Sequence, residues 1–444
     1  MNNHITREQL ENYSTAFNSD RASRVACDAV MAGGLLGSCR NPAVIRKMNH
    51  EFSLTLKQGA ITNQKQSGRC WLFAATNVMR FRIIEKLHLE DFELSQNYLL
   101  FWDKLEKSNW FLENILDTVD EPVGSRILCF LLDAPVADGG QWDMMANLVA
   151  KYGVVPKYSM PESSPSSSTR EMNRILTELL RNDACILRQA AKDKKDRQSL
   201  EEMKGRMLKD VYRMLCICLG EPPKTVDMEA RDKEGKFIQD TGLTPEEFFK
   251  KYVDINLNDY ISLINAPTAH KPFYHRYTVK MLGNVKEGSP VCYLNLPIEE
   301  LKKAAIAQLK DGEPVWFGCD MGPCICRELG IMDPDLYDFK DFLQTDFPMD
   351  KAQRLDYGQS LMTHAMVFQG VNLDENGLPT RWRVENSWGD DKGKKGYFVM
   401  SDSWFTEYMY QVVVNKKYLT KEQLDILNTE TIELEPWDPM GSLA

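Results

Sequence analysis

Apolar residues recur every three or four positions in several stretches of the chain, which is the spacing of a helix with one buried face. The clearest stretch begins at Cys70 and places on one face Leu72, Ala75, Met79, Ile83 and Leu87. Gly68 permits a tight turn just before this helix. Two further helices are expected nearer the N-terminus, over 8–17 and 21–32.

A block of helices is expected over 161–270. Its Ser/Pro-rich start marks a boundary, and Ser168 with Glu171 has the spacing of a capping box for the next helix. Apolar stripes then predict two long helices, the first with Met172, Ile175, Leu176, Leu179 and Leu180 and the second with Met203, Met207, Leu208, Val211, Met214 and Leu215. Thr244 before Pro245 predicts the start of a third helix.

From about residue 271 the pattern changes to short apolar runs that are typical of strands. These runs cover 291–294, 315–318, 361–368, 382–389, 396–400 and 408–414. A turn signal at 374–377 predicts that the third and fourth runs form a hairpin. A helical part followed by a largely antiparallel, barrel-like sheet predicts an α+β fold with a cleft between the two parts.

The composition fits a globular protein of more than one domain. The chain has 444 residues, of which 43% are apolar and 27% charged. No run approaches the ~18–20 apolar residues that a membrane span needs, and the N-terminal region lacks a signal-peptide pattern. We therefore expect no secretory or membrane address. The net charge of −10 argues against a nucleic-acid partner recognised through its phosphates.

The cysteines indicate a reducing compartment, and we expect a cytoplasmic protein. There are 11 of them, scattered without the spacing of a disulfide framework. Two clusters, Cys216 with Cys218 and Cys319 with Cys324 and Cys326, lack both the C-x-x-C spacing and a nearby histidine. Buried thiols explain them better than a zinc site, so no metal is expected.

Cys70 has a physical reason to be reactive, because it opens its predicted helix. A thiol attacks as thiolate, and the N–H groups and positive dipole at a helix N-terminus lower its pKa. Gln64, six positions earlier, can place its side-chain amide beside the Cys70 N–H to hold an oxygen that gains negative charge. The alternative is a buried thiol near a surface amide, and these two residues alone do not exclude it.

The far half of the chain supplies partners for such a thiol. In the predicted hairpin, the alternation of one strand puts His364 on the same face as Met362, while the other strand carries Asn386 and Trp388. Asn386 can accept a hydrogen bond from one ring nitrogen of His364, which leaves the other nitrogen for the thiol. Trp388 can shield that hydrogen bond from water. On its own, His364 would be interpreted as a core histidine.

Together these residues resemble the signature of the papain-type cysteine peptidases: Gln64, Cys70, Trp71, His364, Asn386, Ser387, Trp388 and Gly389, continued by Gly393, Gly396 and Tyr397. The chain departs from that signature twice. Ser67 replaces the first cysteine of the usual motif, so the disulfide made there in papain relatives cannot form. The separation of Cys70 and His364 far exceeds the usual distance of roughly 130–150 residues, which requires a large insertion.

Both departures resemble one branch of the superfamily, the bleomycin hydrolases and bacterial aminopeptidase C enzymes, as do residues 63–71 and 437–444. The resemblance implies amide hydrolysis through an acyl-enzyme, with Cys70 as nucleophile and His364 as proton carrier. It needs no metal or organic cofactor. The thiolate and imidazolium are expected to form a pair before substrate binds. Gly139 and Gly140 resemble the glycine pair whose backbone binds an extended peptide.

The resemblance also implies what the last residues do. Residues 437–444 would lie in the cleft, where the carboxylate of Ala444 would pair with the α-ammonium group of a peptide substrate. That arrangement predicts an aminopeptidase; the alternative is a frayed tail. The implied assembly is a homohexamer whose active sites face an internal chamber, with the insertion as one source of subunit contacts.

The expected domain order follows from these observations: an N-terminal extension (1–60), a helical domain (61–160), a helical insertion (161–270), a β-rich domain (271–436) and a C-terminal arm (437–444). Two other functions stay open. One is acyl transfer by a Cys-His-acid triad, although such enzymes usually orient the histidine with aspartate. The other is a nucleic-acid-binding or scaffold protein, against which the acidic balance speaks.

Overall fold

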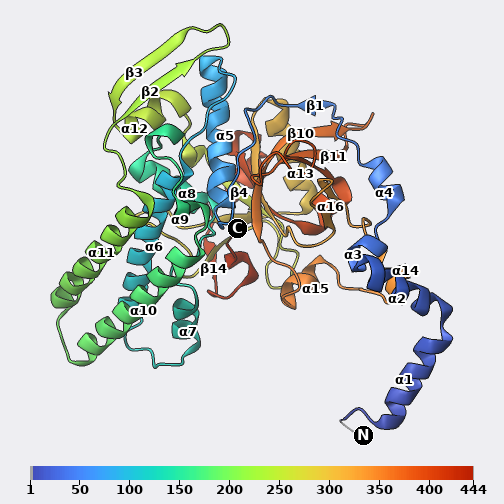
Figure 1. Ribbon diagram of the computed structural model, residues 1–444. Helices are drawn as coiled ribbons and strands as arrows, with labels where there is room; N and C mark the ends of the chain where they lie inside the picture. Colours follow the sequence, from blue (N-terminus) through green and yellow to red (C-terminus); the bar gives the residue numbers. More distant parts are fainter. Residues whose placement is uncertain (1–3, 444) are drawn as a thin grey trace.

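The structure is a computed structural model that describes residues 4–443 (Figure 1). A helical part and a sheet part lie side by side, and the N-terminal helices extend away from both. The helical part contains α5 (Cys70–Leu87), α6 (Gln96–Asp117), α7 (Arg126–Asp133), α8 (Trp142–Tyr152), α9 (Ser164–Ser167), α10 (Arg170–Lys192), α11 (Arg197–Leu219) and α12 (Pro245–Phe248).

Helix α5 lies at the centre of the molecule and begins at Cys70, as predicted. It packs against both α6 and the sheet strand β10 (His364–Leu373), so nearly all its side chains are buried, including those outside the predicted apolar face. Arg80, for example, is buried against Glu385 at 2.9 Å. The helix ends where His88 adopts a left-handed conformation.

The long hairpin of α10 and α11 starts differently from the prediction. The residue before α10 is Thr169, which makes no capping bond to the helix because its hydroxyl donates to Asp138 instead. The capping box predicted for Ser168 and Glu171 is therefore wrong. A capping box is found one turn earlier, on α9, between Ser163 and Ser166. The predicted cap of α12 by Thr244 is confirmed.

The segment 161–270 also contains strands. β2 (Val226–Arg231) and β3 (Phe237–Leu243) form a separate hairpin, and β4 (Tyr260–Ile264) belongs to the main sheet. The expectation of an all-helical segment is therefore too simple, since its last strand pairs with strands far along the chain. The domain limits themselves stay predictions.

The main sheet has twelve strands in the order β14-β5-β6-β4-β13-β7-β10-β11-β12-β9-β8, with β1 also on β10. Its remaining strands are β1 (Leu54–Thr55), β5 (His275–Val279), β6 (Tyr293–Asn295), β7 (Val315–Cys319), β8 (Ile325–Cys326), β9 (Ile331–Met332), β11 (Pro379–Glu385), β12 (Tyr397–Ser401), β13 (Met409–Asn415) and β14 (Thr431–Leu434). The predicted hairpin is the antiparallel pair of β10 and β11.

The α+β class is confirmed, but the sheet is open and not a closed barrel. Within residues 4–443, its end strands β14 and β8 do not pair with each other. Three strand pairs are parallel, namely β14 with β5, β4 with β6, and β12 with β9. Helices on this part of the chain are α13 (Ile298–Lys310), α14 (Phe339–Leu343), α15 (Lys351–Asp356), α16 (Asp402–Tyr408) and α17 (Lys421–Ile426).

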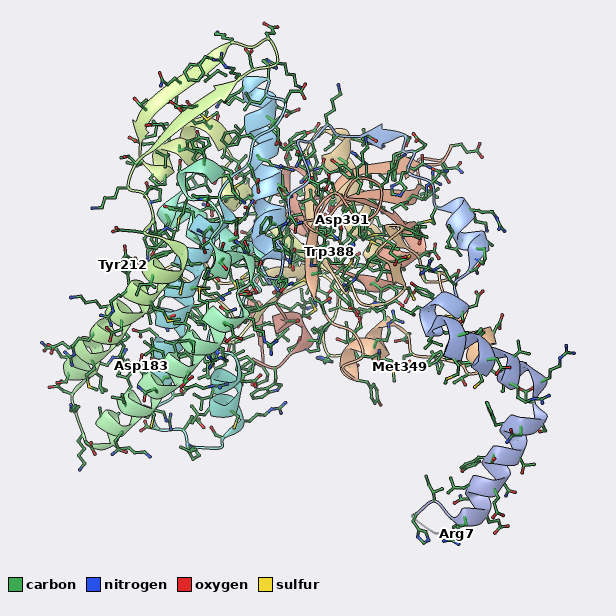
Figure 2. All side chains as sticks on the ribbon, viewed as in Figure 1. Arg7, Asp183, Tyr212, Met349, Trp388 and Asp391 are labelled. Carbon is green, nitrogen blue, oxygen red and sulfur yellow. The ribbon has the colours of Figure 1, made fainter. Side chains whose placement is uncertain are left out.

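The N-terminal helices α1 (Arg7–Ser19) and α2 (Arg21–Gly33) bury none of their side chains. They are followed by α3 (Leu35–Ser38) and α4 (Pro42–Lys47), which lead back to the sheet. Five large apolar side chains of α1 and α2 face solvent: Leu10, Tyr13, Phe17, Val25 and Met31. Figure 2 shows the separation, with Arg7 at the far end of this extension and Trp388 near the middle of the molecule.

Short helical turns complete the chain at η1 (Lys157–Ser159), η2 (Phe249–Val253), η3 (Leu257–Asp259), η4 (Lys416–Tyr418) and η5 (Pro439–Gly441). In the part of the chain described, no helix combines the length and apolar character required to cross a membrane. The N-terminal end of α5 meets β10 and the end of β11, and this junction holds the predicted site.

Candidate active site

Cys70 is the first residue of α5, and its side chain is only 2% exposed. Arg69, at the N-cap, makes no side-chain capping bond, so the helix end keeps free N–H groups. The backbone N–H groups of Trp71 and Ala365 lie within hydrogen-bonding reach of the Cys70 sulfur. Since Ala365 directly follows His364, the fold brings the sulfur to the start of β10.

His364 and Asn386 are both buried, and their Nε2 and Oδ1 atoms lie 2.9 Å apart. The same Oδ1 accepts from the backbone N–H of Ser387 at 2.8 Å, which fixes the orientation of the Asn386 amide. Because this oxygen is an acceptor, Nε2 of His364 carries the hydrogen and Nδ1 keeps its lone pair. The ring of Trp388 lies 5.1 Å from that of His364, centroid to centroid.

Gln64 lies in the loop before α5 and is buried. Its Nε2 donates to the carbonyl of Ser67 at 2.7 Å, and its backbone N–H donates to the carbonyl of Ser387 at 2.8 Å. Asn63 and Trp388 form a β-bridge in the same place. The Gln64 loop is thereby tied to the loop that carries Asn386, and one hydrogen of Nε2 stays available for a ligand.

The glycine pair lies against the residue that follows Cys70. A Cβ atom on Gly140 would lie 2.6 Å from the ring of Trp71, so only glycine fits there. Trp71 Nε1 donates to the carbonyl of Asp138 at 2.8 Å. Lys107, on α6, donates to the carbonyl of Gly139 at 2.6 Å. These contacts hold the glycine loop in a fixed position beside the first turn of α5.

Asp138 is a residue that our sequence analysis did not single out. Its carboxylate pairs with Lys104 at 2.7 Å and accepts from the Gly68 N–H at 3.0 Å and from Asn173 Nδ2 at 2.6 Å. Although burial opposes ionisation, Lys104 and the hydrogen bonds hold the pKa of Asp138 well below its usual range. No local motif marks this residue, because Lys104 and Asn173 lie on helices that are distant from it in sequence.

The last described residues run along the same junction. The hydroxyl of Ser442 donates to the carbonyl of Met362 at 2.6 Å, and Gln141 Nε2 donates to the carbonyl of Ser442 at 2.7 Å. Ser442 therefore lies between the glycine loop and the segment leading to His364. Leu443 packs against the core. Ala444, the predicted substrate-binding end, lies outside the described residues.

Burial opposes the charged forms of both Cys70 and His364. Burial raises the pKa of Cys70 to about 11, a larger effect than the lowering by the N–H groups around its sulfur. Burial likewise lowers the pKa of His364 to about 4, although the hydrogen bond to Asn386 acts in the opposite direction. Burial therefore favours the neutral thiol and the neutral imidazole, and the thiolate–imidazolium pair stays a prediction.

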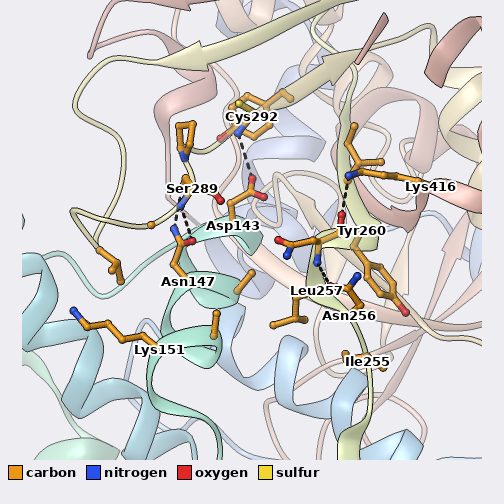
Figure 3. A pocket seen from close by; sticks show the side chains of 18 of the residues that line it. Asp143, Asn147, Lys151, Ile255, Asn256, Leu257, Tyr260, Ser289, Cys292 and Lys416 are labelled. Atoms are coloured by element: carbon orange, nitrogen blue, oxygen red, sulfur yellow. Dashed lines mark hydrogen bonds between the residues drawn. The ribbon is translucent and has the colours of Figure 1, made fainter. Parts of the chain in front are cut away.

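A cavity of about 730 Å³ lies between α8 and the segments 255–261 and 285–292. None of the four predicted catalytic residues lines it. One titratable group in its lining is Asp143, whose carboxyl points toward Cys292 and accepts from that residue's backbone N–H at 3.3 Å (Figure 3). Burial raises the pKa of Asp143 to about 7. The cavity is thus separate from the proposed chemistry.

The cysteines outside the site make no cross-links. All eleven are free thiols, and Cys216 and Cys218 are partly buried. Across residues 4–443, no three His, Cys, Asp or Glu side chains are grouped closely enough to hold a metal ion.

The chain is similar to known proteins over nearly its whole length. Aminopeptidase C of Listeria innocua is 49% identical over 444 residues, covering 100% of both chains. Aminopeptidase C of Streptococcus thermophilus is 50% identical over 417 residues, covering 94% of each. The crystal structure of PepW from Lactobacillus rhamnosis covers 100% of both chains at 50% identity, with a TM-score of 0.98. The family model described as the Peptidase C1-like family matches residues 4–441, and the chain belongs to that family.

Proposed function

We propose that this chain is a cysteine aminopeptidase that removes amino-terminal residues from peptides and related amides. Its family membership and its relatives named Aminopeptidase C support the enzyme class. The single observation that carries the mechanism is the geometry of Cys70, beside Ala365, and of His364, whose Nε2 faces Asn386. Asn386 leaves Nδ1 of His364 free to accept the thiol proton.

The reaction proceeds through an acyl-enzyme. The sulfur of Cys70 bonds to the carbonyl carbon of the scissile amide while Nδ1 of His364 takes the thiol proton. The C–N bond then breaks, and His364 returns the proton to the leaving amine. Water attacks the thioester, passes a proton to His364, and releases the free acid as the Cys70 thiol is restored. No cofactor enters any step.

Charge develops on the carbonyl oxygen in the first step. The backbone N–H of Cys70, at the free end of α5, and the side-chain amide of Gln64 are the donors we assign to that oxygen. The tie between Gln64 and Ser387 supports this role, because it holds the donor in place before substrate arrives. Gly139 and Gly140 are assigned to the substrate backbone, since their loop is fixed beside Trp71.

The C-terminal arm, defined as residues 437–444, explains the preference for amino-terminal residues. Ser442 occupies the junction between Gln141 and Met362, where the earlier residues of a long peptide would otherwise lie. A substrate then enters with its first residue only. The carboxylate of Ala444 would pair with the α-ammonium group of that first residue.

A pair of substrates tests the proposal directly. The full chain is expected to cleave an aminoacyl-aminomethylcoumarin amide, to ignore its N-acetylated analogue, and to lose activity on alkylation of Cys70. Removal of residues 437–444 is expected to permit cleavage of N-acetylated peptides. Hydrolysis that persists after complete alkylation of Cys70 would exclude the thiol mechanism. Unchanged rejection of N-acetylated peptides by the truncated chain would exclude the role of the arm.

We also propose that the protein assembles from copies of itself, as the family resemblance implies for a homohexamer. The apolar side chains of α1 and α2 support this, because the described chain leaves them in solvent at the end of an extended arm. Light scattering on the full chain is expected to give a mass of several copies. Removal of residues 1–33 is expected to reduce that mass; an unchanged mass would show that other surfaces hold the assembly.

The eleven free thiols support a reducing compartment, and we propose the cytoplasm.

A further inference from the structure

The start of the C-terminal arm is held by a buried ion pair. Nζ of Lys271 lies 2.9 Å from Oδ2 of Asp438, and the two side chains are 1% and 9% exposed. His270 lies beside the pair, with its Nε2 2.7 Å from Nζ of Lys271 and 3.7 Å from Oδ2 of Asp438. Lys271 is therefore the group that neutralises Asp438 away from bulk water.

Lys271 is fixed on the body of the protein. Its carbonyl accepts from Nδ2 of the fully buried Asn295 at 2.7 Å, and its N–H donates to the carbonyl of Thr268 at 3.0 Å. Asn295 belongs to β6 and also binds Ala266 through the same amide. The ammonium group of Lys271 thus projects from a loop that is itself tied to the main sheet.

Asp438 also fixes the turn that follows it in the arm. Its Oδ1 accepts from the N–H of Met440 at 2.8 Å, which caps the turn η5. The carbonyl of Met440 in turn accepts from the hydroxyl of Tyr293 at 3.1 Å, and Met440 is buried. The turn therefore sets the direction in which Ser442 and Leu443 continue toward the site.

We propose that Lys271 is a positioning residue that determines specificity. It has no part in bond breaking; it keeps the arm in the cleft by holding Asp438. This inference rests on the proposed aminopeptidase function. Without Lys271, Asp438 would be a buried carboxylate with no permanently charged partner, since only His270 lies nearby, and this costs more than exposing it to water. The arm would then leave the cleft while the remainder of the fold stays in place.

The test measures discrimination between two substrates. For each variant, kcat/KM is determined for an aminoacyl-aminomethylcoumarin amide and for an N-acetylated peptide amide of the same sequence. Lys271→Met is expected to raise the blocked-to-free ratio about tenfold or more, because it removes one partner of a buried pair. Its matched control, Lys303→Met, removes an exposed lysine paired with Glu300 and is expected to leave the ratio unchanged.

A purely structural role for Lys271 would lower both rates together and leave their ratio constant. Lys271→Arg is expected to restore the discrimination, since the charge is kept. Asp438→Asn gives a second route to the same effect: it keeps an oxygen to cap Met440 but removes the ion pair. This variant keeps the test informative if Lys271→Met does not fold.

The chain lacking residues 437–444 distinguishes the positioning role of Lys271 from the role of the arm itself. In that background Lys271→Met is expected to have no further effect on the ratio, because the arm it holds is gone. If truncation raises the ratio but Lys271→Met and Asp438→Asn leave it unchanged, the positioning role is overturned and the aminopeptidase proposal stands. If truncation itself leaves the ratio unchanged, the role of the arm fails, and the role of Lys271 fails with it.

Discussion

His364 donates from Nε2 to Oδ1 of Asn386 across 2.9 Å, and this contact decides which ring nitrogen can act as a base. The amide oxygen cannot reverse its role, because it also accepts from the backbone N–H of Ser387. Nδ1 is therefore the nitrogen that keeps a lone pair for the thiol proton. An imidazole held in this way needs no reorientation when it takes the proton from Cys70.

Asn386→Ala is expected to lower kcat by about tenfold to a hundredfold, since losing one buried hydrogen bond costs roughly 1–3 kcal/mol. KM is expected to change little, because the amide does not touch the substrate. Steady-state kinetics on an aminoacyl amide checks this. Asn372→Ala is the control, since its amide binds only Thr380 at the far end of β10. An equal loss in both variants would contradict the orienting role.

Cys70→Ala is expected to abolish turnover, with a loss of at least about a thousandfold, because no other group can form the acyl-enzyme. Circular dichroism and the unfolding midpoint are expected to stay close to those of the parent chain. Cys27→Ala, which removes an exposed thiol on α2, is the matched control and is expected to keep full activity. Substantial peptidase activity in a folded Cys70→Ala chain would refute the nucleophile.

Gln64→Ala is expected to lower kcat by about a hundredfold to a thousandfold, the usual effect of removing one oxyanion donor. The neighbouring variant Gln66→Ala changes an exposed side chain and is expected to have little effect. For both variants, kcat and KM are determined separately from the rate as a function of substrate concentration. A loss confined to KM would indicate that Gln64 binds the ground state instead.

Asp143→Asn is expected to stabilise the protein at alkaline pH. Folding raises the pKa of Asp143 from 3.8 to about 7, so the folded state binds the extra proton between these values. Stability contributed by the protonated form is lost as pH rises through 7, at a cost of up to about 4 kcal/mol. The two chains should therefore differ little near pH 4 and most above pH 7.

Urea unfolding at several pH values measures this difference in free energy. Asp425→Asn, on the exposed surface of α17, is the control and is expected to shift the curves little at any pH. A difference between Asp143→Asn and the parent chain that does not grow with pH would show that the Asp143 carboxyl is not protonated on folding.

Local patterns were sufficient to predict the elements that carry the site. The apolar spacing after Cys70 predicts α5, and the turn signal at 374–377 predicts the hairpin that brings Asn386 to His364. Both depend on residues close together in sequence. The prediction for the start of α10 failed because it depends on a distant residue. The Thr169 hydroxyl donates to Asp138, thirty-one positions away.

Properties that depend on the complete packing could not be predicted in this way. The high pKa of Cys70 arises from its removal from water, which outweighs the effect of the helix end. The ion pair of Lys271 and Asp438 joins residues that are distant in sequence and that form no motif. The open sheet likewise depends on where β14 and β8 pair, and their sequences alone do not specify their neighbours.

Asp138 joins four segments through one carboxylate: the turn at Gly68, helix α6 through Lys104, the glycine loop to which it belongs, and helix α10 through Asn173. The first turn of the long helical hairpin is therefore tied to the turn that precedes the nucleophile. A displacement at the start of α10 would therefore be felt at the base of the Cys70 helix through a single side chain.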